Sequence, residues 1–252
     1  MSAGERGTLM VTGGSRGIGA AVSRLAAARG YAVAVNYATG RSDAESVVAE
    51  IERAGGRARA FPGDVSRELD VVALFANAVD ALGPLAGLVN NAGITGGSAR
   101  VEDVAFATLE RTFAINVTGS FLCAREAVRR LARSRGGAGG AIVNLSSIAA
   151  RIGGGGEWVH YAASKGAIDA FTRGLAAEVA ADGIRVNAVS PGLIETSIHA
   201  TSAIPDRLAK MTPNVPMKRA GTPEEVAETI VWLLSDAASY VTGAIVEVGG
   251  GR

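Results

Sequence analysis

Short apolar segments of strand length alternate with longer segments of helical periodicity along almost the whole chain. The strand-length segments are bounded by Gly, Asn or Pro, and most are apolar on both faces. This pattern is typical of strands in a parallel sheet that helices cover on both sides. The predicted strands are residues 8–11, 32–36, 58–61, 87–90, 141–145, 185–189 and 244–248, and the predicted helices are residues 18–26, 44–54, 68–82, 108–135, 161–182 and 223–234.

This alternation predicts an α/β fold, a doubly wound sheet of seven parallel strands. The chain has 252 residues, which lies within the range of single α/β domains, and it contains no repeat and no linker of altered composition. We therefore expect one domain over residues 1–252. Residues 193–217 contain three prolines and are long for a loop, so we expect an irregular lid or a functional insertion with short helices there.

Composition and charge exclude several classes of protein. Apolar residues make up 48% of the chain and charged residues 19%, which excludes a disordered protein. The formal net charge is +1, so bulk charge indicates no nucleic acid or other polyanion as a partner. Cys123 is the only cysteine, which excludes an internal disulfide and a zinc site built on cysteines.

The chain carries no segment typical of export or of membrane insertion. The first seven residues contain no apolar stretch, and no run approaches the roughly 18 apolar residues that a membrane span needs. We therefore expect a cytoplasmic protein that does not cross a membrane. His160 and His199 are the only histidines, and neither has a partner at ligand spacing, so we expect no metal site.

A cluster of glycines lies between the first predicted strand and the first predicted helix. Residues 12–19 read Thr-Gly-Gly-Ser-Arg-Gly-Ile-Gly. Glycines at positions 13, 17 and 19 allow a tight turn, a close approach of the backbone to a ligand and packing of the helix on the strand. The helix N-terminus would direct unpaired N–H groups at an anion. A structural turn without a ligand is the alternative, but this position favours the phosphates of a nucleotide.

The residue that ends the second strand bears on the choice of dinucleotide. NAD-binding sites usually place Asp or Glu there to accept hydrogen bonds from the ribose 2′-hydroxyl, and this chain has Asn36 instead. Arg16 in the glycine turn and Arg41 beyond the strand are candidate partners for a 2′-phosphate. Two solvated arginines are the alternative interpretation. We predict NADP(H) as the preferred cofactor, with NAD(H) as a second possibility.

Tyr161 and Lys165 are four residues apart in a predicted helix and therefore share a helical face. A phenol has a reference pKa near 10, which is too high for a base at neutral pH. A nearby ammonium group favours the phenolate and can lower its pKa by about 1–3 units. The pair therefore predicts a general acid or base, although this spacing also occurs by chance in surface pairs.

Two further polar groups are candidates for the same site. Ser146 and Ser147 follow the fifth predicted strand, where ligands of parallel sheets bind, and a serine hydroxyl there could donate to a carbonyl oxygen. A serine that caps a turn is the alternative. Asn116 lies inside a helical pattern, where asparagine is unfavourable. It could hold a water in a proton path or be a buried amide satisfied locally.

Taken together, these residues resemble the short-chain dehydrogenase/reductase family. The resemblance covers nearly the whole chain, because the motifs occur in the order and approximate spacing of that family. They are Thr12-Gly-x-x-x-Gly-x-Gly19, Asn90-Asn-Ala-Gly93, Asn116, Ser147, Tyr161-x-x-x-Lys165, Pro191-Gly192, Tyr240-Val-Thr-Gly243 and Val248-Gly-Gly250.

The resemblance implies a Rossmann-type domain with a catalytic tetrad. Tyr161 would be the general acid or base and Ser147 would orient the substrate oxygen. Lys165 would lower the tyrosine pKa and bind the nicotinamide ribose, and Asn116 would support a water relay. The cofactor-binding residues expected beside Tyr161 and Lys165 are Gly13, Ser15, Arg16, Gly17, Ile18, Gly19, Asn36, Arg41, Asp64, Val65, Asn91, Ala92, Gly93, Pro191, Gly192, Ile194 and Thr196.

Two departures from the family pattern bear on the substrate. The interval between Ser147 and Tyr161 is one residue longer than the common spacing and contains residues 153–158, Gly-Gly-Gly-Gly-Glu-Trp. This leaves open whether Ser146 takes the role of Ser147. Ketoacyl reductases of the family tend to carry a basic residue before the Gly-Ile step, for binding an acidic carrier protein, whereas this chain has Asp182.

We therefore predict an oxidoreductase that transfers a hydride between NADP(H) and a small carbonyl compound or secondary alcohol. One alternative is an enzyme similar to 3-oxoacyl-(acyl-carrier-protein) reductases, which Asp182 disfavours. Another is a non-catalytic NADP(H) sensor, which would have no use for a Tyr–Lys pair. Members of the family are commonly homotetramers paired through helices near residues 108–135 and 161–182, so we also expect a homotetramer.

Overall fold

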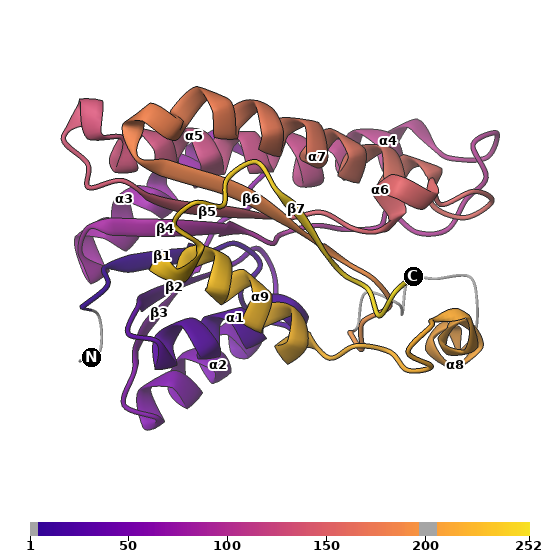
Figure 1. Cartoon of the computed structure of the whole chain (residues 1–252), viewed down its shortest axis with the longest axis horizontal. Helices are drawn as coiled ribbons and strands as arrows, with labels where there is room; N and C mark the ends of the chain where they lie inside the picture. The colour runs from indigo at the N-terminus through magenta and orange to yellow at the C-terminus, as the bar shows by residue number, and fades with distance from the viewer. Residues whose placement is uncertain (1–4, 197–205) are drawn as a thin grey trace.

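A seven-stranded parallel sheet runs through the centre of the molecule (Figure 1). The structure is a computed structural model, and it describes residues 5–196 and 206–252. The strand order is β3-β2-β1-β4-β5-β6-β7, so the winding reverses between β1 and β4. The strands are β1 (Thr8–Val11), β2 (Ala32–Tyr37), β3 (Arg57–Pro62), β4 (Leu85–Asn90), β5 (Gly140–Leu145), β6 (Ile184–Pro191) and β7 (Ile245–Val248). The predicted doubly wound fold is confirmed.

Helices cover both faces of this sheet and divide the apolar core into two layers (Figure 1). One core packs α1 (Gly17–Ala28), α2 (Arg41–Arg53) and α9 (Pro223–Leu234) on the sheet. The other packs α3 (Glu68–Leu82), α5 (Gly119–Leu131) and α7 (Val159–Val179) on the opposite face. Because both faces are covered, the central strands are buried along their whole length, as their continuous apolar runs predict.

The predicted helix over residues 108–135 is wrong as a single element. It consists of α4 (Phe106–Phe113), a π-helical turn at Ala114–Thr118, α5, and a short 3₁₀ helix at Arg133–Arg135. A π-helical turn inserts an extra residue into a helix and is frequent at functional sites. Asn116 lies in this turn, so the asparagine that is unfavourable in a regular helix marks the irregular segment.

The irregular region after β6 contains short helices, as expected for residues 193–217. Within its described part, α8 (Arg207–Met211) is followed by a 3₁₀ turn at Thr212–Asn214. Residues 197–205, which include His199 and one of the three prolines, lie outside the described residues. A further short helix, α6 (Ala149–Ile152), precedes the glycine-rich loop and is absent from the predicted elements.

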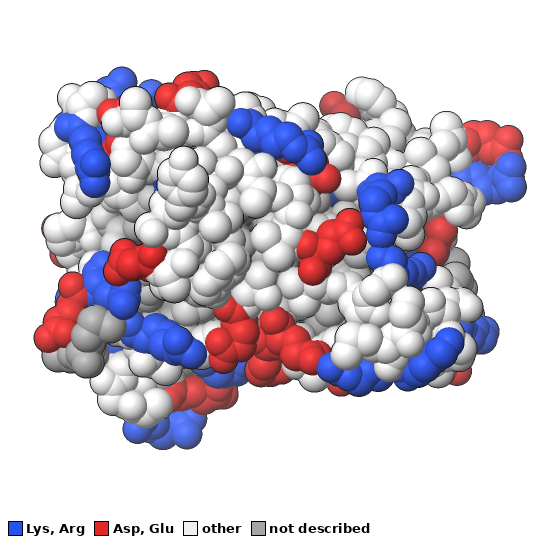
Figure 2. Space-filling model, viewed as in Figure 1, with Lys and Arg blue, Asp and Glu red and all other residues white. Residues whose placement is uncertain are grey.

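Neither a membrane segment nor a metal cluster is found over residues 5–196 and 206–252. No helix there has the length and apolar character needed to span a membrane. His, Cys, Asp and Glu side chains do not gather there in groups of three that could hold a metal ion. On the face drawn in Figure 2, basic and acidic side chains are interspersed, with no large area of one sign.

The capping box at the start of α9 generates a test of local stability. Thr222 Oγ1 accepts a hydrogen bond from the Glu225 backbone N–H (3.3 Å), and the Glu225 carboxylate accepts one from the Thr222 N–H (2.9 Å). We expect Thr222→Ala to lower the free energy of unfolding by about 1 kcal/mol, measured by urea denaturation. Glu224→Gln changes a neighbouring residue outside the box and should have little effect. Equal effects of the two substitutions would contradict this role of Thr222.

Candidate active site

A cavity of about 1060 Å³ lies at the carboxyl ends of the strands. Turns that follow β1, β2, β4, β5 and β6 line it, so it opens where the strand order reverses and where ligands of doubly wound sheets bind. Of the predicted site residues, those that line the cavity are Gly13, Ser15, Arg16, Gly17, Ile18, Asn36, Asp64, Val65, Asn91, Ala92, Gly93, Ser147, Tyr161, Lys165, Pro191, Gly192, Ile194 and Thr196. Gly19, Arg41 and Asn116 are not among its lining residues.

The turns after β1 and β4 are joined by hydrogen bonds. Thr12 Oγ1 accepts from the backbone N–H groups of Asn91 (3.0 Å) and Ala92 (3.1 Å). Asn91 Nδ2 donates to the carbonyls of Thr12 and Gly13, both at 2.9 Å. A Cβ on Gly19 would lie 2.3 Å from the Gly13 carbonyl oxygen, so only glycine allows α1 to start this close to the turn. Gly19 therefore determines the shape of the turn, although it does not line the cavity.

The first turn of α1 fits the phosphates of a dinucleotide. It lines the cavity, it contains no acidic residue, and no side chain of the described residues caps it. The first N–H groups of a helix need acceptors, and phosphate oxygens supply them at a positively polarised helix end. The start of α9 shows the contrast, because its own Thr222 and Glu225 satisfy such groups.

The end of β2 differs in part from the expected 2′-phosphate site. Arg16 lines the cavity and lies 3.7 Å from Asp43 in an exposed ion pair. Arg41 does not reach the cavity, because it begins α2 and pairs with Glu45 at 2.7 Å on the exposed side of that helix. Tyr37, which ends β2, and residues 38–39 after it also line the cavity and were not among the expected residues.

The Asn36 side chain is buried and holds backbone in place. Its Oδ1 accepts from the Gly13 N–H (3.2 Å), and its Nδ2 donates to the carbonyls of Phe61 (3.3 Å) and Gly63 (3.0 Å). Asn36 therefore links the glycine turn to the end of β3. Its amide is used for these contacts, and the position carries no carboxylate.

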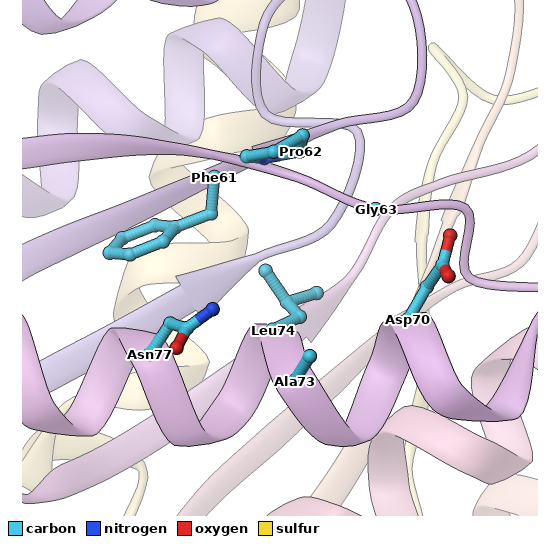
Figure 3. Close-up of a pocket in the computed structure, with 7 residues that line it drawn as sticks. All are labelled: Phe61, Pro62, Gly63, Asp70, Ala73, Leu74 and Asn77. Carbon is cyan, nitrogen blue, oxygen red and sulfur yellow. The ribbon is translucent and has the colours of Figure 1, made fainter.

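The loop after β3 carries Asp64 and Val65 to the cavity. A small hollow between the end of β3 and α3, lined by residues 61–63 and by Asp70, lies beside this loop (Figure 3). Asp70 accepts from the Asp64 backbone N–H at 3.1 Å. Burial opposes ionisation of the Asp64 carboxyl, but hydrogen bonds from Ser66 and Arg111 hold its pKa below the usual value. The loop is thus fixed by charged contacts.

Tyr161, Lys165 and Ser147 meet at the other end of the cavity. Lys165 Nζ lies 5.7 Å from the centre of the Tyr161 ring and donates to the Leu145 carbonyl at 2.6 Å. The Ser147 side chain makes a hydrogen bond with Tyr161. Ser146 instead directs its hydroxyl to the Lys165 carbonyl at 3.5 Å. The geometry therefore favours Ser147 over Ser146 as the serine that accompanies the tyrosine.

The pKa of Tyr161 differs from the expected direction. Burial raises it above the usual value, and the hydrogen bond with Ser147 only partly opposes this. Lys165 is also buried, which lowers its own pKa to about 8, while the Asp169 carboxylate acts in the opposite direction. The lowering of this pKa that the sequence predicts is therefore not produced by these contacts, because the effect of desolvation is larger than that of the hydrogen bond with Ser147.

Asn116 lies behind the cavity wall as a fully bonded amide. Its Oδ1 accepts from the Ile94 N–H and its Nδ2 donates to the Ile94 carbonyl, both at 2.9 Å. Nδ2 also lies 3.0 Å from Ser164 Oγ, to which it donates. Of the two interpretations of this residue, the buried amide satisfied locally describes these contacts. A Cβ on Gly93 would lie 3.3 Å from Asn116 Oδ1 and 3.5 Å from Lys165 Nζ, so Asn116 borders the reacting end.

Several residues outside the expected set complete the far end of the cavity. They lie on the glycine-rich loop before α7, on α8 and at residue 252, and they include Glu157, Trp158, Arg207, Met211 and Arg252. Glu157 and Arg207 form an ion pair although 50 residues separate them in the sequence. The longer loop before Tyr161 and the irregular region over residues 193–217 both pointed to this end of the cavity, but no local pattern marks Arg207 itself.

Two other residues that the sequence singled out have structural contacts. His160 is buried, and its Nε2 lies 2.8 Å from the Thr95 carbonyl, so it anchors the loop after β4. The Asp182 carboxylate accepts from the Ser134 N–H at 3.0 Å. Asp182 therefore holds the connection between α5 and β5.

Comparison with known proteins identifies relatives along nearly the whole chain. A family model described as enoyl-(acyl carrier protein) reductase matches residues 13–252. The uncharacterized oxidoreductase YgfF of Escherichia coli (strain K12) is 53% identical over 96% of this chain and 98% of its own length. Glucose 1-dehydrogenase 2 of Bacillus subtilis (strain 168) is 37% identical, covering 97% and 93%. The 3-oxoacyl-(acyl-carrier-protein) reductase FabG of Staphylococcus aureus is 38% identical, covering 96% of each.

Solved structures are also similar to this chain over nearly its whole length. A dehydrogenase/reductase from Sinorhizobium meliloti 1021 superposes with a TM-score of 0.90 at 36% identity, covering 99% of this chain and 96% of that one. A short-chain dehydrogenase/reductase from Serratia marcescens gives 0.89 at 33% identity, covering 97% and 96%. A blue fluorescent protein from a metagenomic library, in complex with NADPH, gives 0.88 at 36% identity with the same coverage. The chain belongs to the short-chain dehydrogenase/reductase family of oxidoreductases.

Proposed function

We propose that this protein is an NADP(H)-dependent oxidoreductase that interconverts a small carbonyl compound and the corresponding alcohol. One observation carries the proposal: Tyr161, Lys165 and Ser147 converge on a cavity whose other end is the uncapped N-terminus of α1. One end therefore suits phosphates and the other suits a reacting oxygen. The preference for NADP(H) is supported by Asn36, which brings no carboxylate to the end of β2, and by Arg16.

Each catalytic role follows from the contacts of the side chain. A bound NADPH supplies the hydride, and the protein supplies orientation and the proton. Tyr161 donates its hydroxyl proton to the substrate oxygen in reduction and removes a proton in oxidation. Ser147 holds the same oxygen through a hydrogen bond, and Lys165 places a positive charge where negative charge develops. Asn116 fixes the loop at Ile94 and, as the resemblance implies, would border a water relay.

Two alternatives remain distinguishable from this proposal. A reductase of carrier-linked acyl groups would bind its acidic partner through basic groups, and Arg129 and Arg130 near the end of α5 already pair with the buried Glu126 at 2.7 Å. Asp182, used at the Ser134 turn, adds a negative charge near this helix end. A non-catalytic sensor would have no need of a buried tyrosine and lysine, whose burial disfavours their charged forms.

We also propose a homotetramer built on the helices α4, α5 and α7. Two phenylalanines on this face are partly exposed, Phe113 at 37% and Phe121 at 49%. Phe121 stacks on Phe171 of α7 with ring centres 3.8 Å apart, which joins the two helices into one apolar surface. Such a surface suits contact with a second copy. The cytoplasmic location stays a prediction from the sequence.

The role of Tyr161 is tested by removing its hydroxyl. We expect Tyr161→Phe to lower kcat by about 100-fold or more, because general acid catalysis contributes that much, while NADPH binding is nearly unchanged. Steady-state assays on a panel of ketones, aldehydes and sugars, with fluorescence titration of NADPH, measure both. Tyr240→Phe, at a fully exposed tyrosine, is the control. Unchanged turnover in Tyr161→Phe would refute the assignment, and tight cofactor binding without any turnover would favour the sensor.

The choice of dinucleotide is tested at the two arginines. Arg16→Ala should weaken NADPH binding about tenfold or more, the size expected for a charge-assisted contact to phosphate, and leave NADH binding almost unchanged. Arg41→Ala removes an arginine outside the cavity and is the matched control. Isothermal titration with both cofactors measures the four affinities. Equal losses for NADPH and NADH would count against a 2′-phosphate contact.

The pKa of Lys165 generates a test by pH. With a pKa of about 8, Lys165 loses its positive charge as the pH rises through that value, so reductive kcat/KM should fall there. The Asp169 carboxylate raises this pKa, so Asp169→Asn should move the alkaline limb to lower pH. Glu178→Gln removes an exposed carboxylate of the same helix and should leave the profile in place. An alkaline limb that Asp169→Asn does not shift would rule out this coupling.

A further inference from the structure

A buried ion pair lines the far end of the cavity. The Arg207 guanidinium donates from a single nitrogen to both carboxylate oxygens of Glu157. The side chains are only 9% and 17% exposed, and both residues line the cavity. Surface ion pairs contribute little because water screens them, but a pair this buried holds its charges in a fixed arrangement.

Aromatic contacts connect this pair to the reacting tyrosine. The Arg207 guanidinium carbon lies 4.0 Å from the centre of the Trp158 ring, within the range of a cation–π contact. Trp158 packs edge-on against Tyr161, with ring centres 6.0 Å apart. The guanidinium, the indole and the phenol therefore form a row of contacts from α8 to α7, so the ion pair borders the end of the cavity that contains Tyr161.

The glycine-rich loop before α7 allows the pair to form. Gly154 has a φ of +62° and accepts at its carbonyl from the Trp158 N–H at 2.8 Å. A Cβ there would lie 2.8 Å from the Trp158 carbonyl oxygen, so the loop needs glycine at this position. The Glu157 carbonyl accepts from the Ala99 N–H at 3.0 Å, which also fixes the loop after β4. Glu157 is therefore held from two sides while it faces α8.

We propose that the Glu157–Arg207 pair determines specificity and that it selects small, oxygen-rich substrates, with hydroxyl groups next to the reacting carbon. This inference rests on the proposed function and names its substrate class. Substrate oxygens at this wall gain hydrogen bonds to charged groups, which are stronger than those between neutral groups. A long alkyl or acyl chain would have to lie against desolvated charges without offering them any partner.

Three aldehydes test this selection. Glyceraldehyde and propanal have the same chain length and differ by two hydroxyl groups, and decanal adds a long chain. We expect the native enzyme with NADPH to prefer glyceraldehyde over propanal in kcat/KM by about tenfold or more, the value of a hydrogen bond to a charged group. Decanal should be the poorest of the three substrates. The preference should arise mainly in KM, since the wall binds the substrate and does not transfer the proton.

The informative variant removes both charges at once. A single substitution would leave one buried charge without its partner and destabilise the fold, so Glu157→Gln is combined with Arg207→Met. This double variant should lose the preference for glyceraldehyde about tenfold and improve on decanal. Its NADPH affinity and thermal midpoint should stay near those of the native enzyme. Arg207→Lys keeps the charge and should retain most of the preference.

The matched control removes an exposed ion pair elsewhere. Arg29 and Glu228 pair at 3.5 Å between α1 and α9, with side chains 58% and 60% exposed. Arg29→Met combined with Glu228→Gln should leave the substrate ratios unchanged. Native ratios in the Glu157/Arg207 double variant, or a native enzyme that prefers propanal or decanal, would overturn the inference while the proposed function stands. If no carbonyl compound of the larger panel is turned over, the proposed function fails and the inference fails with it.

Discussion

Hydrogen bonds between the turns after β1 and β4 hold the two halves of the sheet in register at the point where the winding reverses. Thr12 receives two backbone N–H groups of the β4 turn, and Asn91 returns two hydrogen bonds to the β1 turn. These groups would otherwise be buried without partners, and each such loss costs about 1–3 kcal/mol. These hydrogen bonds fix two of the turns that line the cavity, at the point where the strand order reverses.

Burial dominates the electrostatics of the reacting end. The same loss of water that raises the pKa of Tyr161 lowers that of Lys165 to about 8, because burial disfavours the charged form of each group. Neighbouring groups act in the opposite direction: the hydrogen bond with Ser147 lowers the pKa of Tyr161, and the Asp169 carboxylate raises that of Lys165. Both pKa values therefore depend on the balance between desolvation and the polar contacts of the site.

Features of this molecule that depend on local sequence patterns could be predicted from the sequence, whereas contacts between distant segments could not. The alternation of apolar runs depends on local periodicity, so the seven strands and most helices were predicted within a few residues. Motif residues that follow strands, such as Gly13 and Ser147, line one cavity because parallel strands bring their carboxyl ends to one edge. Arg41, expected at the cofactor site, does not line the cavity, because its pairing with Glu45 depends on where α2 begins. The contact of Glu157 with Arg207 spans two loops, whose conformations no local pattern encodes.

The groups proposed for catalysis and those proposed for substrate selection lie on different parts of the fold. Tyr161 lies on α7, Ser147 closely follows β5, and the glycine turn joins β1 to α1, so their positions follow from sheet geometry. Regular elements hold reacting groups more rigidly than long loops do. Glu157 and Arg207 lie on a glycine-rich loop and on a five-residue helix after the irregular segment. Substitutions there change the wall that the substrate meets while the proton donor and the phosphate end stay in place. The loop and α8 meet at the contacts of Arg207 with Glu157 and Trp158, whereas Lys165 is anchored on β5 through the Leu145 carbonyl. A family that keeps one chemistry can in this way accept many substrates, since the groups that transfer the proton and those that recognise the remaining atoms belong to different parts of the fold.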